Sequence, residues 1–161
     1  MTEAGYRKNV GIVLFNQAGR VLLCARNDQV EDNWQFPQGG VESGEEIESA
    51  AVRELYEETG VKSVKLVAEI PECLRYDFPE NFKLPFKGQE QHWFLFYFTG
   101  SDDEIRLDVN SQEIEFRSYR WGDINEAPKL IIDFKKEVYY KVVNFFNPII
   151  NDYLRGKTNG V

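Results

Sequence analysis

The sequence predicts an α/β fold in which a mixed β-sheet lies between helices. Short apolar stretches with strand-like patterns recur between residues 9 and 121, and a strongly signalled helix follows the second of them. A longer helical pattern occupies residues 133–154. The order strand, strand, loop, helix, three strands, helix is typical of a sheet packed against helices.

Size and composition predict one compact domain over residues 1–161. The chain is 42% hydrophobic and 14% aromatic, enough to bury a full core. No apolar run reaches the roughly 18–20 residues of a membrane span, and the N-terminus lacks the apolar stretch of a signal peptide. We therefore expect a soluble, cytoplasmic protein. Cys24 and Cys73 match no metal-binding spacing and are expected to be reduced thiols in the core.

The overall charge is acidic. Nineteen basic and 27 acidic residues give a formal net charge of -8, which by itself argues against a dedicated nucleic-acid-binding surface. Several acids cluster in one segment, however, where a bound cation would neutralise part of the charge. The local field around that segment therefore matters more than the net charge.

The first elements predict a β-hairpin. Apolar runs at residues 9–15 and 20–26 flank a turn at residues 16–19. A polar loop at residues 27–33 leads into residues 34–40, where a proline and paired glycines disfavour regular structure.

The signals for the helix that follows are strong. Ser43 and Glu46 have the spacing of a capping box, and Glu45, Glu46 and Glu48 place negative charge at the positive end of the helix dipole. Gly60 is typical of a C-terminal stop.

The second half of the chain predicts three strands and two helices. The strands are expected at residues 65–70, 92–99 and 114–121. Residues 76–88 contain two prolines and three phenylalanines and are expected to form a structured loop. Pro148 is expected to divide the final helical region into two helices.

Three glutamates share one face of the central helix. Glu54, Glu57 and Glu58 stand at i, i+3 and i+4, positions that meet on one side of an α-helix. They fall on or beside the apolar stripe of the same helix, which consists of Ile47, Ala50, Ala51 and Leu55. The carboxylates are therefore expected to point towards the protein body.

Carboxylates turned inward need positive charge beside them. Unpaired, they would be costly to bury, and Arg53 alone cannot compensate three of them. Oxygen ligands, in a chain with one histidine, suit Mg²⁺ or Mn²⁺ better than zinc. The Gly39-Gly40 pair before the helix lets backbone groups approach such an ion or a phosphate closely. We predict a cation site that faces a phosphate-sized space.

The same segment resembles the Nudix box. Its nine defined positions fall within the 23 residues from Gly39 to Val61 and are all matched, by Gly39, Glu45, Arg53, Glu54, Leu55, Glu57, Glu58, Gly60 and Val61. Residues 5–11, 34–40, 88–94 and 134–135 further resemble bacterial RNA pyrophosphohydrolases and plant-type dinucleoside tetraphosphate hydrolases. The resemblance runs from about Gly5 to Phe146 and implies an α/β/α sandwich.

The resemblance implies roles for residues in the box. Glu54, Glu57 and Glu58 correspond to metal ligands, and the Gly39 carbonyl to a further ligand. Arg53 corresponds to a residue that orients a glutamate through a charge-assisted hydrogen bond.

Two residues outside the box bear on the chemistry. Glu115 stands where the subfamily keeps an acid that binds a metal or takes the proton from the attacking water. Alternatively, Glu115 is a solvent-facing residue on a strand, because Glu113, two residues earlier, would lie on the same face of that strand. His92, the only histidine, is interpreted as a packing or hydrogen-bonding residue of a strand rather than a catalytic base.

Substrate contacts are also implied by resemblance. Arg26, Phe134 and Lys135 correspond to residues that contact a base and phosphates, while Arg7 and Tyr76 are expected to line the same pocket. The alternative is that Phe134 belongs to the core of the last helix and that Arg7 and Lys135 are surface charges.

The leading functional hypothesis is therefore a cation-dependent hydrolase that removes pyrophosphate from 5′-triphosphorylated RNA. The rival within the enzyme class is a dinucleoside tetraphosphate hydrolase, since residues 69–71 and 76–79 resemble the plant-type members. A catalytically silent nucleotide-sensing module is the alternative from another class. No obligate protein partner is evident in the sequence.

Overall fold

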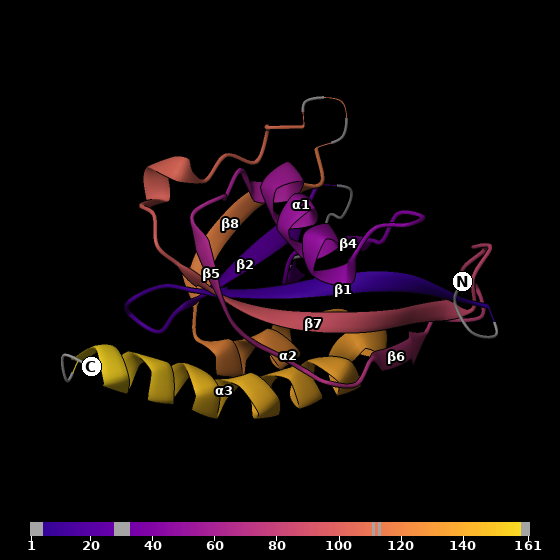
Figure 1. The fold of residues 1–161 in the computed structure, drawn as a ribbon. Helices are drawn as coiled ribbons and strands as arrows, with labels where there is room; N and C mark the ends of the chain where they lie inside the picture. Colours follow the sequence, from indigo (N-terminus) through magenta and orange to yellow (C-terminus); the bar gives the residue numbers. More distant parts are fainter. Residues whose placement is uncertain (1–4, 28–32, 111, 113, 159–161) are drawn as a thin grey trace.

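One mixed β-sheet organises the molecule. The computed structural model describes residues 5–27, 33–110, 112 and 114–158. Its two longest strands, β1 (Tyr6–Phe15) and β7 (Gly88–Phe98), lie side by side and parallel, from the pair Tyr6 and Gly88 to the pair Phe15 and Tyr97 (Figure 1). All other strand pairs are antiparallel.

Shorter strands complete this eight-stranded sheet. The central path runs β3-β2-β1-β7-β5, while β4 pairs with β1, β6 with β7 and β8 with β2. The bounds of these strands are β2 (Val21–Arg26), β3 (Trp34–Gln35), β4 (Gln38–Gly40), β5 (Val64–Glu69), β6 (Leu74–Asp77) and β8 (Phe116–Gly122).

The predicted hairpin is confirmed, but its strands separate at once. β1 and β2 pair only at Phe15 and Val21, next to the turn. The segment 34–40 enters the opening between them, where β3 pairs with β2 and β4 pairs with β1. The prediction that this segment lacks regular structure is therefore wrong. Pro37 lies between β3 and β4 and lacks an N–H group, while its carbonyl accepts the N–H of Ile12 at 2.9 Å.

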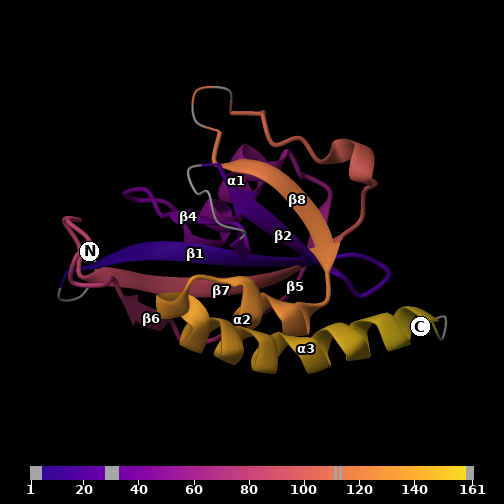
Figure 2. The same cartoon turned by 180° about the vertical axis from the view of Figure 1, so that it is seen from behind.

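Helices cover both faces of the sheet, which confirms the predicted fold class. α1 (Ile47–Thr59) lies on one face, and α2 (Ala127–Leu130) and α3 (Lys136–Thr158) lie on the other (Figures 1 and 2). Alternate residues of β7 serve the two cores, with Trp93 on the α3 side and Phe94 on the α1 side. Short 3₁₀ helices occur at η1 (Asp102–Glu104), η2 (Ile124–Glu126) and η3 (Asp133–Lys135).

Pro148 does not divide the last helix, so that prediction is wrong. α3 is 23 residues long and continues through this proline. Proline removes one helical hydrogen bond, at a cost of about 3 kcal/mol. Phe146 and Ile150, before and after it, are 0% and 2% exposed in the core on this face of the sheet. Burying such a side chain contributes about 1.5–3 kcal/mol, so packing on both sides holds the helix together.

The start of α1 also differs from the prediction. The N-cap is Glu46, whose side chain makes no capping hydrogen bond, so the capping box from Ser43 is wrong. The Glu45 carboxylate instead accepts the N–H of Glu42 at 3.0 Å and closes a separate turn before the helix begins. The predicted stop is confirmed, since Gly60 adopts φ 78° and its N–H donates to the Tyr56 carbonyl.

Three further expectations can be compared with the structure. Among the described residues, no helix is long and apolar enough to cross a membrane. Cys24 is fully buried as expected. Cys73, just before β6, is only partly buried, so its expected place in the core is wrong, and its thiol lies beside the Glu90 carboxylate of β7. Residues 28–32 of the predicted polar loop lie outside the described residues.

Candidate active site

The three glutamates of α1 turn towards the protein body, as the helical spacing predicts. Glu58 is 7% exposed, next to the fully buried Leu55. The side chains of Glu54 and Glu57 are 16% and 33% exposed. The helix thus carries its acids on the border of its buried face, where they need partners.

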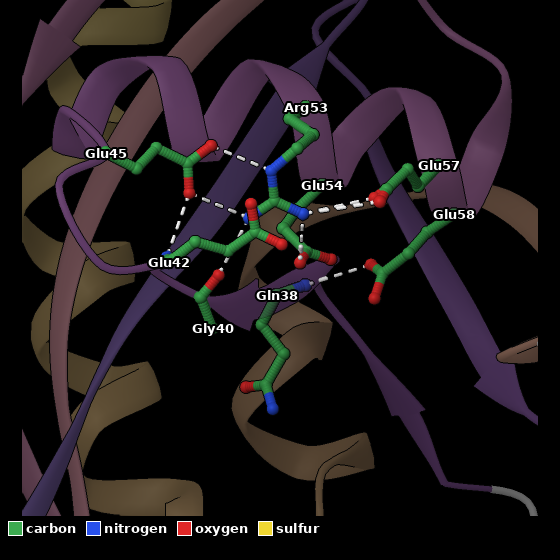
Figure 3. A network of polar contacts seen from close by, with 8 residues as sticks. All are labelled: Gln38, Gly40, Glu42, Glu45, Arg53, Glu54, Glu57 and Glu58. Carbon is green, nitrogen blue, oxygen red and sulfur yellow. Dashed lines mark hydrogen bonds and ion pairs between the residues drawn. The ribbon is translucent and has the colours of Figure 1, made fainter.

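Arg53 supplies part of the compensation. Its Nη1 atom donates to Glu54 Oε1 at 2.9 Å and to Glu57 Oε2 at 3.1 Å. On its other side, Nε and Nη2 donate to the two oxygens of Glu45, and Nη2 also reaches the Gly40 carbonyl at 3.0 Å (Figure 3). This ion pair lowers the pKa of Glu45. One guanidinium thus joins α1, β4 and the turn before the helix.

The glycine pair of β4 makes room for two charged side chains. A Cβ atom at Gly39 would overlap the Glu54 carboxyl group, and one at Gly40 would overlap the Arg7 guanidinium. A side chain at either position would therefore displace the Glu54 carboxyl group or the Arg7 guanidinium from its present place against the β4 backbone.

Glu58 has no contact with Arg53. Figure 3 shows its carboxylate apart from the guanidinium, where Oε1 accepts the Gln38 N–H at 3.2 Å. Burial raises the pKa of Glu58 well above its ordinary value, and Glu54 and Glu115 raise it further. Burial also raises the pKa of Glu54 to about 7, despite its hydrogen bond with Arg53. Positive charge is therefore insufficient around these two carboxyls.

Glu115 joins the acids of α1 in one cavity. The cavity has a volume of about 350 Å³ and is lined by Glu54, Glu57, Glu58 and Glu115 together with Gly39 and Gly40. We call it the carboxylate chamber. Glu115 lies just before β8 rather than within the strand expected at residues 114–121, and its Oε2 atom is 3.9 Å from Arg26 Nη2. Glu113, which was expected to share a strand face with Glu115, lies outside the described residues.

The donor set fits a hard divalent cation. In residues 5–27, 33–110, 112 and 114–158, no three acidic, histidine or cysteine side chains converge in the geometry of a metal site. Arg53 donates to oxygens of Glu54 and Glu57. The chamber nevertheless offers four carboxylates, two of them with pKa values raised by burial. Such a set favours Mg²⁺-like ions over soft metals.

A second cavity of about 490 Å³ adjoins the first. We call it the aromatic chamber. It contains every residue predicted to contact substrate, namely Arg7, Arg26, Tyr76, Phe134 and Lys135. The two chambers share a wall, formed by Arg7, Arg26, Gln35, Gln38 and Gln89.

Phe134 and Lys135 do not belong to the last helix. They lie in η3, just before α3, and Phe134 is half-buried with its ring centroid 5.6 Å from that of Tyr76. Lys135 is buried, and its Nζ atom lies 5.7 Å from the Tyr76 ring centroid. The alternative for Phe134 is wrong in placing it within the last helix, although its ring does pack against the core on that side of the sheet. The alternative for Lys135, a surface charge, is wrong.

His92 is not part of either chamber. It lies in β7 and lines neither cavity. Partial burial and the nearby Lys8 lower its pKa. This position agrees with its interpretation as a strand residue without a role in proton transfer.

Comparison with known proteins decides the family. A family model described as "NUDIX domain" matches residues 5–142. The chain belongs to the Nudix family. An RNA pyrophosphohydrolase of Caulobacter vibrioides is 48% identical over 156 residues, which cover 91% of this chain and 90% of that protein. The enzyme class expected from the sequence, a Nudix pyrophosphohydrolase, is thereby confirmed.

Solved Nudix structures share the fold. The E. coli dihydroneopterin triphosphate pyrophosphohydrolase aligns with a TM-score of 0.67 at 21% identity. The alignment covers 86% of this chain and 97% of that protein's chain. A C. elegans Ap4A hydrolase, solved as a binary complex, has a TM-score of 0.63 at 22% identity and covers 87% and 97%. Nudix hydrolases generally need divalent cations, which agrees with the donor set of the carboxylate chamber.

The sequence did not reveal several residues that line the cavities of this Nudix domain. Phe78, Phe82 and Phe86 line the aromatic chamber, and their concentration in residues 76–88 was the only signal. Gln89 lines both chambers at 7% exposure, and its Oε1 atom has no hydrogen-bond partner among the described residues.

Proposed function

We propose that this protein removes pyrophosphate from the 5′ end of triphosphorylated RNA, in a reaction that needs Mg²⁺ or Mn²⁺. Water adds across the anhydride between the α- and β-phosphates. The products are 5′-monophosphorylated RNA and inorganic pyrophosphate.

The contrast between the two connected chambers carries this proposal. The carboxylate chamber contains four acids beside the shared residues Arg7 and Arg26, whereas the charged residues that line the aromatic chamber are these two arginines and Lys135, all cationic. A polyphosphate neutralised by divalent cations suits the first chamber, and a nucleobase with its phosphodiester suits the second. A nucleoside polyphosphate extended by RNA would place the matching groups in each.

Residues of the carboxylate chamber would hold the cations. We assign Glu54, Glu57, Glu58 and the Gly39 carbonyl as ligands, with Glu115 as a further ligand or as the acceptor of the proton from water. When bound, the cations supply charge neutralisation and an acidified water for an in-line displacement. Arg53 then serves to orient the glutamates through the contacts described above.

The aromatic chamber would hold the RNA. Arg26 and Phe134 offer planar groups on which a base can stack, and Lys135 offers positive charge to a phosphate. Arg7 and Tyr76 line the same space. The similarity to the Caulobacter RNA pyrophosphohydrolase supports the same choice of substrate.

Hydrolysis of dinucleoside tetraphosphates is the second candidate. The shared fold with a C. elegans Ap4A hydrolase and the resemblance of residues 69–71 and 76–79 to plant-type members favour it. The intact set of box residues disfavours a silent nucleotide-sensing module. We also propose that residues 1–161 form a single Nudix domain, supported by the one sheet that unites residues 6–122 and by α3 packing on it.

Steady-state kinetics on the purified protein tests the proposal. Triphosphorylated RNA and diadenosine tetraphosphate are compared at equal concentration with Mg²⁺. We expect a higher kcat/KM for the RNA, with release of pyrophosphate. Undetectable RNA turnover alongside rapid dinucleotide cleavage would assign the protein to the second candidate.

A further inference from the structure

The loop between β6 and β7 exposes several large apolar side chains. Of the eight large hydrophobic side chains exposed among the described residues, three lie in this loop, residues 78–87. They are Phe82, Leu84 and Phe86, at 41%, 50% and 38% exposure. Such concentrations of exposed apolar surface mark binding sites.

The loop is well anchored without these rings. At its base, the Phe78 N–H donates to the Lys87 carbonyl at 2.7 Å, and the Lys87 N–H donates to the Gly5 carbonyl at 2.9 Å. A turn closed by the Phe82 N–H and the Pro79 carbonyl, at 2.9 Å, positions the exposed phenyl ring. The backbone therefore presents Phe82 in a defined place.

Phe82 extends the wall of the aromatic chamber. Its ring lies edge-on to Phe134, with centroids 5.5 Å apart, and nearly parallel to Phe78, with centroids 6.2 Å apart. All three rings line the chamber, as do Leu84 and Phe86. The stacking surface thus continues from η3 out to the loop.

We infer that loop 78–87 binds a nucleobase of single-stranded RNA, downstream of the base held beside Phe134, with Phe82 as the stacking residue. This inference rests on the proposed function. The loop is continuous with the chamber, whose charged lining is cationic, and it contains Lys83 and Lys87 against one acid, Glu80. An aromatic surface with positive charge binds single strands with little sequence preference.

The inference predicts that catalytic efficiency depends on the length of the RNA. A mononucleoside triphosphate would reach only the carboxylate chamber, and a dinucleotide would add the base beside Phe134. A third nucleotide is the first that could contact Phe82. Catalytic efficiency should therefore rise again when a third nucleotide is added, and Phe82 should be responsible for that rise.

The test compares triphosphorylated RNAs of one, two, three and five nucleotides on the wild type, Phe82→Ala and Phe82→Tyr. For Phe82→Ala we expect kcat/KM to fall roughly 5- to 10-fold for the two longer RNAs, mostly through KM, because base–aromatic stacking is lost. The one-nucleotide substrate should be cleaved at wild-type efficiency, and the two-nucleotide substrate should lose less than the longer RNAs, because Phe82 contacts Phe134 but would not stack on its base. Phe82→Tyr, which keeps an aromatic face, should restore the longer RNAs.

Phe145→Ala is the matched control, since Phe145 is 39% exposed and lines neither chamber. It should leave all four substrates unchanged. If the wild type cleaves RNA but Phe82→Ala loses nothing, or loses equally at every length, the loop does not bind a downstream base although the proposed function stands. If the wild type cleaves none of the RNAs, both proposals fall.

Discussion

Arg53 and Glu45 form a two-pronged ion pair between α1 and the turn that precedes it. Nε lies 2.7 Å from Oε2 and Nη2 lies 2.9 Å from Oε1. This pair fixes the plane of the guanidinium, so that Nη1 is directed at Glu54 and Glu57. Glu45 thereby positions two carboxylates that it does not touch.

Replacing Glu45 tests this relationship. In Glu45→Gln the guanidinium loses a charged anchor, and we expect the metal concentration for half-maximal activity to rise about 10- to 100-fold, as for other residues that support metal ligands. Metal titration of activity measures the effect. Glu46→Gln, an exposed neighbour at the N-cap, is the control and should titrate like the wild type. Equal titrations for all three proteins would remove the positioning role of Glu45.

Metal removal tests the central chemical argument. Four carboxylates line one chamber and Arg53 compensates only some of them. We expect an excess of EDTA to abolish turnover and added Mg²⁺ or Mn²⁺ to restore it, measured by release of pyrophosphate. Full activity in EDTA would contradict a cation-dependent mechanism.

Glu57→Gln should separate catalysis from folding. We expect turnover to be lost, while the melting temperature of the metal-free protein stays unchanged or rises slightly because one of several crowded carboxylates is neutralised. Calorimetry in EDTA and steady-state rates measure the two effects. By comparison, His92→Gln should keep the rate within several-fold of the wild type. Near-normal turnover by Glu57→Gln would show that this residue is dispensable.

The stability of the metal-free protein should depend on the protonation of Glu54. Burial raises its pKa from 4.5 to about 7 in the folded state, while the unfolded chain keeps the ordinary value. The resulting stabilisation is complete below about pH 4.5 and is lost as the pH rises through 7. In Glu54→Gln this contribution is absent, so its melting temperature should fall less between these pH values. Parallel melting curves in EDTA would contradict the shifted pKa.

The double variant Phe134→Ala with Lys135→Ala tests the choice of substrate. Both residues line the aromatic chamber, so RNA turnover should suffer much more than dinucleotide turnover. The wild-type RNA reaction should also weaken more steeply with salt, because lysine and arginine contacts to phosphate release counterions. Both substrates are measured with both proteins across a salt series. Equal losses on the two substrates would exclude an RNA-specific pocket.

Local sequence determined much of this protein. The inward face of Glu54, Glu57 and Glu58 follows from helical spacing, and the helix stop at Gly60 follows from the αL conformation that glycine adopts easily. These features depend on neighbours within about one helical turn. They can therefore be predicted without knowing how the chain folds back on itself.

Tertiary structure decided the strand register, the contacts between distant segments and the continuity of the last helix. The parallel register of β1 with β7 joins strands far apart in the chain, and it brings Arg7 and Gln89 into one wall. Tertiary packing also places Phe82 of the β6–β7 loop against Phe134 of η3, a contact that no local sequence pattern indicates. Even the continuity of α3 through Pro148 depends on burial against the sheet. The free energy gained by packing α3 against the sheet outweighs the local cost of Pro148. A local sequence pattern contains no information about this packing.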